Sequence, residues 1–138
     1  MSYLLDTNVI SEARKRGGNP SVMAWFESVP GRDLYLSVLV VGEIRQGIER
    51  LERSDPQQAS GYEAWLNDLR QRFSGHVLDV SVDVAEEWGR WNVPDPISTI
   101  DGLLAATARV HGLTLVTRNT GDLERTGVPL INPFEPVG

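Results

Sequence analysis

Short apolar runs alternate along the chain with longer segments in which apolar residues recur at the spacing of a helix. The short runs predict strands, at residues 3–5, 34–36, 76–78, 114–116 and 130–131. The segments between them predict helices, at residues 9–15, 20–29, 38–51, 56–73, 82–91 and 98–111. Short strands separated by helices are typical of a parallel sheet that is covered on both faces. The sequence therefore predicts an α/β fold, a three-layer sandwich around a central, mainly parallel sheet of four to five strands.

The chain is expected to form a single domain, residues 1–138, because it contains no repeat and no linker. Its length is sufficient to bury a core without disulfides or structural metals. Hydrophobic residues make up 41% and charged residues 23%, as in ordinary globular proteins, which argues against a disordered chain. The absence of cysteine excludes disulfide scaffolds, thiolate zinc sites and cysteine nucleophiles.

The sequence predicts no membrane segment and no secretory signal. The longest uncharged stretch covers residues 17–26, far short of the roughly 20 apolar residues that a spanning helix needs. Asp6 ends the first apolar run, and no basic region precedes that run. We therefore expect a cytoplasmic protein without a membrane partner.

The charge of the chain argues mildly against a nucleic-acid partner. Nineteen acidic and 13 basic residues give a net charge of −6, whereas nucleic-acid binders are usually basic. One basic run, formed by Arg14, Lys15 and Arg16, fits two interpretations. It could hold RNA phosphates, or it could be a solvated helix end whose cations lie near the negative end of the helix dipole. The sequence leaves both open.

Two acidic residues follow predicted strands, where parallel sheets bind their ligands. Asp6 comes directly after the first strand and begins the cluster Asp6-Thr7-Asn8, in which all three side chains carry oxygen. Asp122 follows the fourth strand, and Thr117 and Asn119 add oxygen atoms at the same end of the sheet. Taken singly, Asp6 could be a polar turn residue and Asp122 could cap a short helix.

Two further acidic residues lie in predicted helices. Glu43 falls at the edge of an apolar stripe, so we expect it to be partly desolvated; the alternative is a solvated side chain paired with Arg45 or Arg50. Asp101 stands three residues after Ser98 at the start of an apolar helix, which is the spacing of a capping box. Capping alone would explain Asp101, although a helix start beside a sheet edge is also a common ligand site.

The joint placement of the four acids points to a cation. Carboxylates that follow separate elements of one parallel sheet would meet at one edge, and like charges at close range oppose joint ionisation. Oxygen ligands without histidine or cysteine favour Mg²⁺ or Mn²⁺ over zinc. Such ions activate water and neutralise phosphate, which indicates phosphoryl transfer or phosphodiester hydrolysis.

Four segments of the sequence resemble the motifs of PIN-domain nucleases, in order and with compatible spacing. They are residues 3–12, 37–47, 100–108 and 111–119. The combination is similar to the VapC toxins of bacterial toxin–antitoxin pairs, especially the FitB-like branch, and it covers nearly the whole chain.

This resemblance implies a toxin that acts as an Mg²⁺- or Mn²⁺-dependent endoribonuclease on RNA. It also implies a homodimer and a VapB-type antitoxin as inhibitor. The implied metal ligands are Asp6, Glu43, Asp101 and Asp122, and the implied supporting polar groups are Thr117 and Asn119.

Two other classes of function remain as alternatives. An aspartyl-phosphate phosphatase or receiver domain also places acids at strand ends, but it needs a lysine late in the chain. Lys15 is the only lysine and lies early, and Asn8 stands where such a phosphatase has its second aspartate. A catalytically silent PIN-fold binding module is the other alternative, and the presence of all four acids gives no support to it.

Overall fold

The computed structural model describes residues 1–136 and contains one five-stranded sheet. The strands are parallel and lie in the order β3-β2-β1-β4-β5. Their bounds are β1 Tyr3–Leu5, β2 Leu34–Ser37, β3 Val77–Leu78, β4 Thr114–Val116 and β5 Leu130–Ile131. The predicted sheet is confirmed, and each strand lies within one residue of its predicted position.

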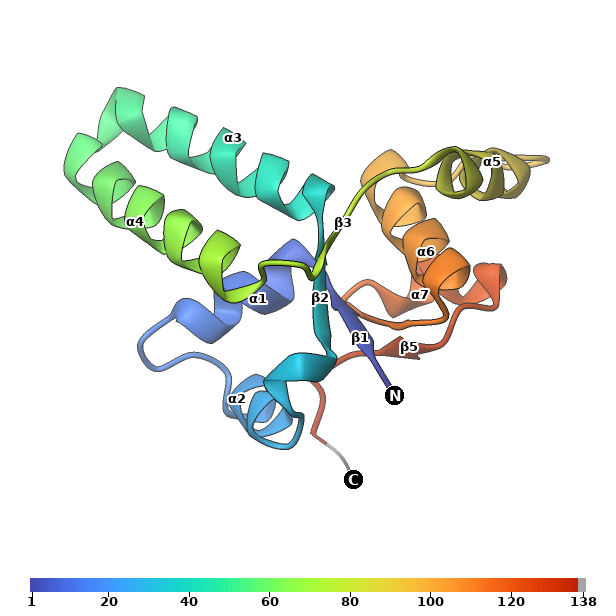
Figure 1. The fold of residues 1–138 in the computed structure, drawn as a ribbon, viewed down its shortest axis with the longest axis horizontal. Coiled ribbons are helices and arrows are strands. Elements are labelled where there is room, and N and C mark those ends of the chain that lie inside the picture. Colours follow the sequence, from blue (N-terminus) through green and yellow to red (C-terminus); the bar gives the residue numbers. More distant parts are fainter. Residues whose placement is uncertain (137–138) are drawn as a thin grey trace.

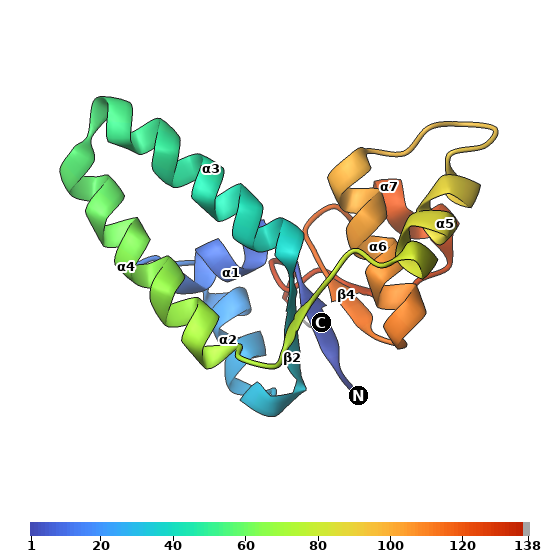
Figure 2. The same cartoon turned by 45° about the horizontal axis from the view of Figure 1, so that its top comes forward.

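Helices cover both faces of this sheet. Their bounds are α1 Thr7–Arg14, α2 Pro20–Glu27, α3 Val38–Ser54, α4 Pro56–Arg72, α5 Val82–Trp91, α6 Thr99–His111 and α7 Thr120–Leu123. Figures 1 and 2 show α1–α4 on one side of the sheet and α5–α7 on the other, which makes the three predicted layers. Within the described residues, no helix is long and apolar enough to cross a membrane.

The first helix begins two residues earlier than the apolar spacing predicts. The backbone of Asp6 is extended, and its side chain accepts a hydrogen bond from the backbone N–H of Asn8. An aspartate in this position satisfies one of the free N–H groups at a helix start. Helix α1 therefore follows β1 without any intervening loop, and this fixes the direction in which the chain leaves the sheet.

The central strand β1 is buried on both faces. Leu4 and Leu5 have no exposed surface, and β1 pairs with β2 on one side and with β4 on the other. Leu115 and Val116 of β4 are equally buried. Because apolar burial is the main stabilising term in folding, the end of β1 is a rigid place from which to hold a side chain.

Helices α3 and α4 form a long hairpin that extends away from the sheet (Figure 1). The hairpin turns at Asp55, whose carboxylate accepts a hydrogen bond from the backbone N–H of Gln58 and caps α4. Arg14 of α1 contacts the hairpin at α4: its guanidinium lies 4.0 Å from the ring centre of Tyr62 and 5.4 Å from that of Trp65. Such cation–π contacts tie α4 to α1.

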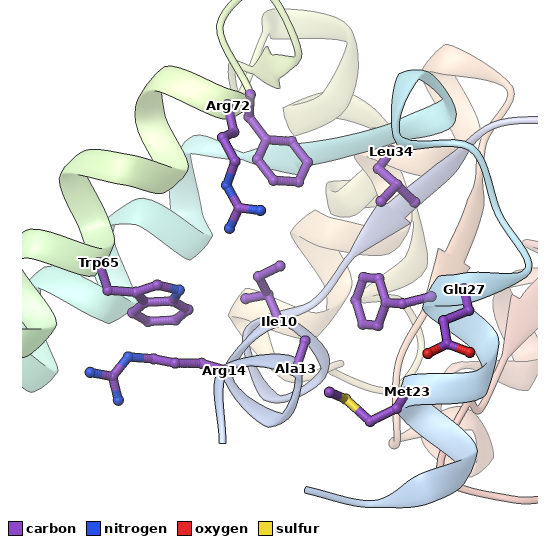
Figure 3. A pocket seen from close by; sticks show the side chains of 10 residues that line it. Ile10, Ala13, Arg14, Met23, Glu27, Leu34, Trp65 and Arg72 are labelled. Carbon is purple, nitrogen blue, oxygen red and sulfur yellow. The ribbon is translucent and has the colours of Figure 1, made fainter. Parts of the chain in front are cut away.

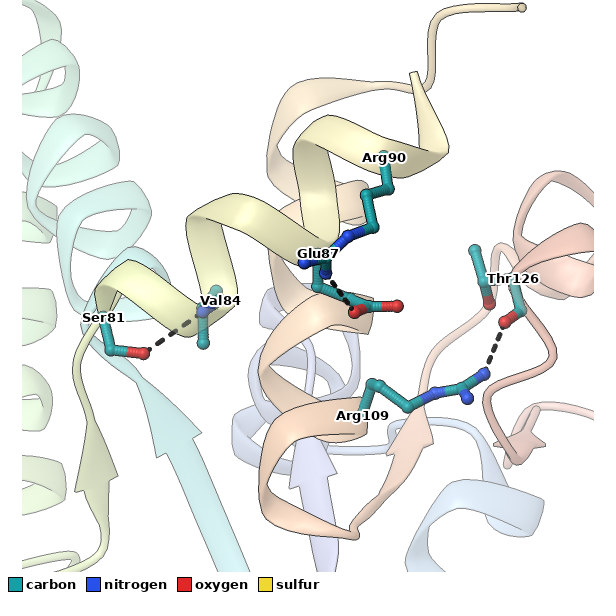
Figure 4. Close-up of polar contacts among 6 residues, drawn as sticks. All are labelled: Ser81, Val84, Glu87, Arg90, Arg109 and Thr126. Atoms are coloured by element: carbon teal, nitrogen blue, oxygen red, sulfur yellow. Dashed lines mark hydrogen bonds and ion pairs between the residues drawn. The ribbon is translucent and has the colours of Figure 1, made fainter. Parts of the chain in front are cut away.

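On the opposite side of the sheet, side chains stabilise α5 and join α6 to the C-terminal segment. Ser81 caps α5 by accepting a hydrogen bond from the Val84 N–H, and Glu87 pairs with Arg90 on the same helix (Figure 4). Arg109 of α6 donates a 2.6 Å hydrogen bond to the carbonyl of Thr126. The chain that leads into β5 is thereby held against α6.

A close approach between α5 and α6 gives a stability prediction. A Cβ atom added at Gly102 would lie 2.8 Å from Ile97 Cγ2 and 2.8 Å from Trp88 Cδ1. We expect Gly102→Ala to lower the free energy of unfolding by about 1–3 kcal/mol, because overpacking outweighs the gain in helix propensity. Urea denaturation measures the change.

Gly89 of α5 provides the matched control. Within the described chain, a Cβ at this helical glycine would meet no atom within 4 Å. Gly89→Ala should therefore raise stability by about 0.5–1 kcal/mol, the helix propensity difference alone. Equal stabilities of the two variants would contradict the packing described for Gly102.

Candidate active site

Asp6 lies buried at the carboxyl end of the central strand. Its backbone N–H donates to the carbonyl of Val116, so the pairing of β1 with β4 continues up to this residue. One carboxylate oxygen accepts from the Asn8 N–H at 2.7 Å, and the other accepts from the Thr117 hydroxyl at 2.6 Å. Only 6% of Asp6 is exposed, and no Lys, Arg or His within residues 1–136 forms an ion pair with it.

Burial raises the pKa of Asp6 above its ordinary value of 3.8. The hydrogen bonds from Thr117 and Asn8 lower the pKa but do not outweigh burial, and the negative charge of Asp101 raises it further. The negative charge of Asp101 therefore acts on a carboxylate that has little access to water. A bound cation would relieve both the desolvation and the repulsion.

Asp101 is joined to Asp6 through two polar side chains. The amide nitrogen of Asn119 donates to Asp101 Oδ2 at 2.7 Å, and the Asn119 backbone N–H donates to Thr117 Oγ1 at 3.1 Å. Thr117, which is 1% exposed, then donates to Asp6. Four of the six predicted site residues thus form one hydrogen-bonded chain at the carboxyl ends of β1 and β4.

The capping box predicted for Ser98 and Asp101 is wrong in its first half, the hydrogen bond accepted by the Ser98 side chain. Ser98 occupies the N-cap position of α6, but within residues 1–136 its side chain makes no capping hydrogen bond. Asp101 lies in the first turn of α6, where its charge complements the helix dipole, and it accepts a hydrogen bond from Asn119. Its carboxylate therefore faces the site.

Glu43 reaches the same region from α3. It is half-buried, as predicted, and accepts a hydrogen bond from the hydroxyl of Thr7, the residue directly after Asp6. The alternative pairing with Arg45 is not realised, because Arg45 forms an ion pair of 2.7 Å with Glu63 of α4. The sequence indicates Thr7 as an oxygen-bearing residue beside Asp6. It does not indicate the hydrogen bond to Glu43, because the two residues are 36 positions apart in the chain.

Asp122, unlike Glu43, has a side chain that bonds neither the predicted site residues nor a neighbour of one among the described residues. It lies exposed in α7 and, in the part of the chain that is described, forms no hydrogen bond or ion pair with the other three acids. Its position after β4 still leaves it at the same edge of the sheet.

The donor set suits a hard divalent cation. Among residues 1–136, no three acidic or histidine side chains are grouped closely enough to form a complete metal cage. Mg²⁺, however, is usually held by one or two carboxylates together with water and substrate phosphates. Asp6 and Asp101 supply two carboxylates, while Thr117 and Asn119 orient them.

Two members of the basic run, which the sequence leaves open as a phosphate site or a solvated helix end, contact other side chains of the protein. Arg14 lies over Tyr62, and Figure 3 shows it extended beside Trp65. Lys15 pairs with Glu12 at 3.1 Å, and Arg16 is exposed. All three residues are exposed, and both interpretations of the run remain predictions.

The sequence also identifies the family of the chain. The PIN domain family matches residues 3–129, and the chain therefore belongs to that family. Within it, the chain is 34% identical to Toxin FitB of Neisseria gonorrhoeae over 95% of this chain and 97% of that protein. It is 31% identical to the VapC ribonuclease Y4jK of Sinorhizobium fredii, over 96% of this chain and 98% of that protein.

A solved structure supports the same family membership. The chain superposes on a structure of FitAB bound to a DNA fragment with a TM-score of 0.88 and 31% identity. The match covers 99% of this chain and 98% of that chain. The predicted membership of the PIN-domain toxins, in the branch that resembles FitB, is confirmed.

The raised pKa of Asp6 predicts how stability depends on pH in the absence of metal. Since the pKa is higher in the folded protein than in the unfolded chain, the stabilisation from protonated Asp6 is present below pH 3.8 and is lost as pH rises through the folded value. Asp6→Asn removes the charge that causes this loss; its amide oxygen can accept from the Asn8 N–H, and its amide nitrogen can donate to Thr117 Oγ1 instead of accepting from it. In EDTA we expect the variant to gain stability relative to wild type as the pH is raised from below 3.8 to about 7.

Urea denaturation at the two pH values measures this difference. Asp33→Asn is a suitable control, because Asp33 lies at the far end of β2, just before that strand begins. A stability difference between Asp6→Asn and wild type that stays constant with pH would contradict the burial argument.

Proposed function

We propose that this protein is the toxin of a toxin–antitoxin pair and acts as an Mg²⁺- or Mn²⁺-dependent endoribonuclease. The observation that carries the proposal is the chain Asp6–Thr117–Asn119–Asp101 at the carboxyl ends of two adjacent parallel strands. The name of the relative Y4jK, a VapC ribonuclease, supports the choice of RNA as substrate. We expect the protein to act in the cytoplasm, where RNA is present.

Asp6 and Asp101 would hold the metal ion, with Glu43 beside them and Asp122 at the rim. When bound, the ion would lower the pKa of a water molecule and neutralise charge on the phosphodiester. The protein residues orient the carboxylates: the Thr117 hydroxyl holds Asp6, the Asn119 amide holds Asp101, and the Thr7 hydroxyl holds Glu43. Asp101 Oδ1 and Glu43 Oε2 accept none of these bonds and are free to take a ligand or a proton.

Asp101→Asn tests this site directly. The loss of the charge–dipole interaction costs roughly 0.3–1 kcal/mol, and relief of repulsion with Asp6 offsets it, so the variant in EDTA should be as stable as wild type. Excess Mg²⁺ should raise the melting temperature of wild type more than that of the variant. RNA cleavage should fall by roughly 100-fold or more.

Asp83→Asn is the matched control, since Asp83 is likewise an acid in the first turn of a helix, α5. It should lose roughly 0.3–1 kcal/mol of stability and keep both the Mg²⁺ response and cleavage. If Asp101→Asn behaves like this control in all three measurements, Asp101 is a helix residue and not a metal ligand.

We further propose that a small antitoxin inhibits the enzyme by presenting a basic side chain to the carboxylates. The complex FitAB, on which this chain superposes, supports a partner of this kind. The resemblance to VapC toxins also leads us to expect a homodimer.

Production of the wild-type chain alone should therefore arrest bacterial growth, whereas Asp6→Asn should not. Growth curves after induction, with soluble protein measured in parallel, provide the comparison. Normal growth of cells that contain soluble wild-type protein would count against a toxin.

A further inference from the structure

A cavity of about 310 Å³ opens beside the acidic residues, between α1, α3 and α4. Thr7 and Glu43 form its edge toward Asp6, and both belong to the site described above. The cavity is therefore continuous with the place where a phosphodiester bond would be cleaved. In an RNA bound there, the base of the adjoining nucleotide lies only one sugar away from that phosphate.

Two aromatic side chains form part of the wall of this cavity, across from Ile44, Ile48 and Leu51 of α3. Tyr62 and Trp65 of α4 line it, with ring centres 6.0 Å apart and ring planes at 77°. The guanidinium of Arg14 lies over Tyr62 at 4.0 Å and holds these rings in place from α1. Aromatic side chains of this kind stack with bases in many proteins that bind single-stranded nucleic acid.

The edge of the cavity is polar, with the hydroxyls of Thr7 and Ser11 and the carboxylate of Glu43. Flat aromatic walls combined with a few polar groups match the shape and chemistry of a nucleobase, which has an apolar face and a hydrogen-bonding edge. An aliphatic side chain of a protein partner would offer no hydrogen bond to Ser11 or to the second carboxylate oxygen of Glu43, whereas the edge of a base can offer one. The lining therefore favours a base over a protein side chain.

Gly47 keeps the cavity open. It lies within the 17-residue helix α3 and lines the cavity, and among the described residues a Cβ built on it meets no atom within 4 Å. Glycine is the least favourable residue after proline inside a helix. Because a Cβ at this position has open space around it, we expect a larger side chain to extend from it into the cavity.

We propose that this cavity binds the base of the nucleotide next to the cleaved phosphodiester and so contributes to the choice of cleavage position. The proposal rests on the endoribonuclease function argued above. It assigns a substrate-binding role to Gly47, Tyr62 and Trp65, which the sequence pattern alone indicates only as helix residues.

The test fills the cavity with Gly47→Leu and removes the base from the substrate. The cleavage position is first mapped on RNA by sequencing the ends, and an oligomer is then made with an abasic nucleotide beside that position. For wild type, loss of the base should lower kcat/KM roughly tenfold to a hundredfold. Gly47→Leu should cleave the intact oligomer as poorly as wild type cleaves the abasic one, and loss of the base should have no further effect.

Gly89→Leu is the matched control, a helical glycine on α5 whose Cβ likewise meets no atom within 4 Å in the described structure. It should cleave both oligomers like wild type. Gly47→Ala, which occupies less of the cavity, should have an intermediate effect and serves if the leucine variant does not fold. The Mg²⁺-induced shift in melting temperature should be unchanged in all three variants.

The outcomes separate this inference from the proposed function. Absence of RNA cleavage by wild-type protein with Mg²⁺ or Mn²⁺ would overturn both. Wild-type cleavage that is equally efficient with Gly47→Leu, or equally efficient on the abasic oligomer, would overturn the base-binding role alone. Resistance of Gly47→Leu to the antitoxin together with normal cleavage would assign the cavity to a protein side chain instead.

Discussion

The burial of one carboxylate, that of Asp6, determines the arrangement of the whole site. Leu4 and Leu5 fix β1 in the middle of the sheet, so Asp6 cannot turn toward solvent without breaking the pairing with β4. Its ionised form is then stabilised by hydrogen bonds from Thr117 and Asn8. The bond from Thr117 requires a buried threonine at the end of β4. The bond from the Asn8 N–H starts helix α1 directly after the strand. The residue that caps α1 is thus also the central residue of the proposed metal site.

This arrangement is unfavourable for the protein alone and favourable for a protein that binds a cation. The pKa of Asp6 is raised because burial outweighs its hydrogen bonds, and Asp101 adds a like charge. Neutral donors, the hydroxyl of Thr117 and the amide of Asn119, occupy the positions where a structural ion pair would have an arginine or lysine. They orient the carboxylates without neutralising them. The negative charge is thus preserved for a ligand, at a cost that the apolar core of the sheet has to offset.

The fold and most of the site could be predicted from the sequence for a physical reason. In a parallel sheet the carboxyl ends of all strands meet at one edge, so Asp6, Thr117 and Asn119 could be placed together from strand positions alone. Contacts between residues distant in the chain could not be predicted in this way. They are the Thr7–Glu43 hydrogen bond, the Asn119–Asp101 hydrogen bond and the position of Tyr62 and Trp65 beside the cavity. Helical spacing indicates that Tyr62 and Trp65 share a face of α4, but not what that face meets.

Helix α1 couples the acidic residues to the aromatic cavity. Its first residue, Thr7, bonds Glu43 of α3, and its last residue, Arg14, lies over Tyr62 of α4. Both helices of the hairpin are therefore positioned from α1, and α1 is itself positioned by the Asp6 cap at the end of β1. A displacement of the hairpin would move Glu43 and the cavity wall together relative to Asp6. In the proposed complex with RNA, the distance between the reacting phosphate and its neighbouring base would therefore be set by one eight-residue helix anchored in the sheet.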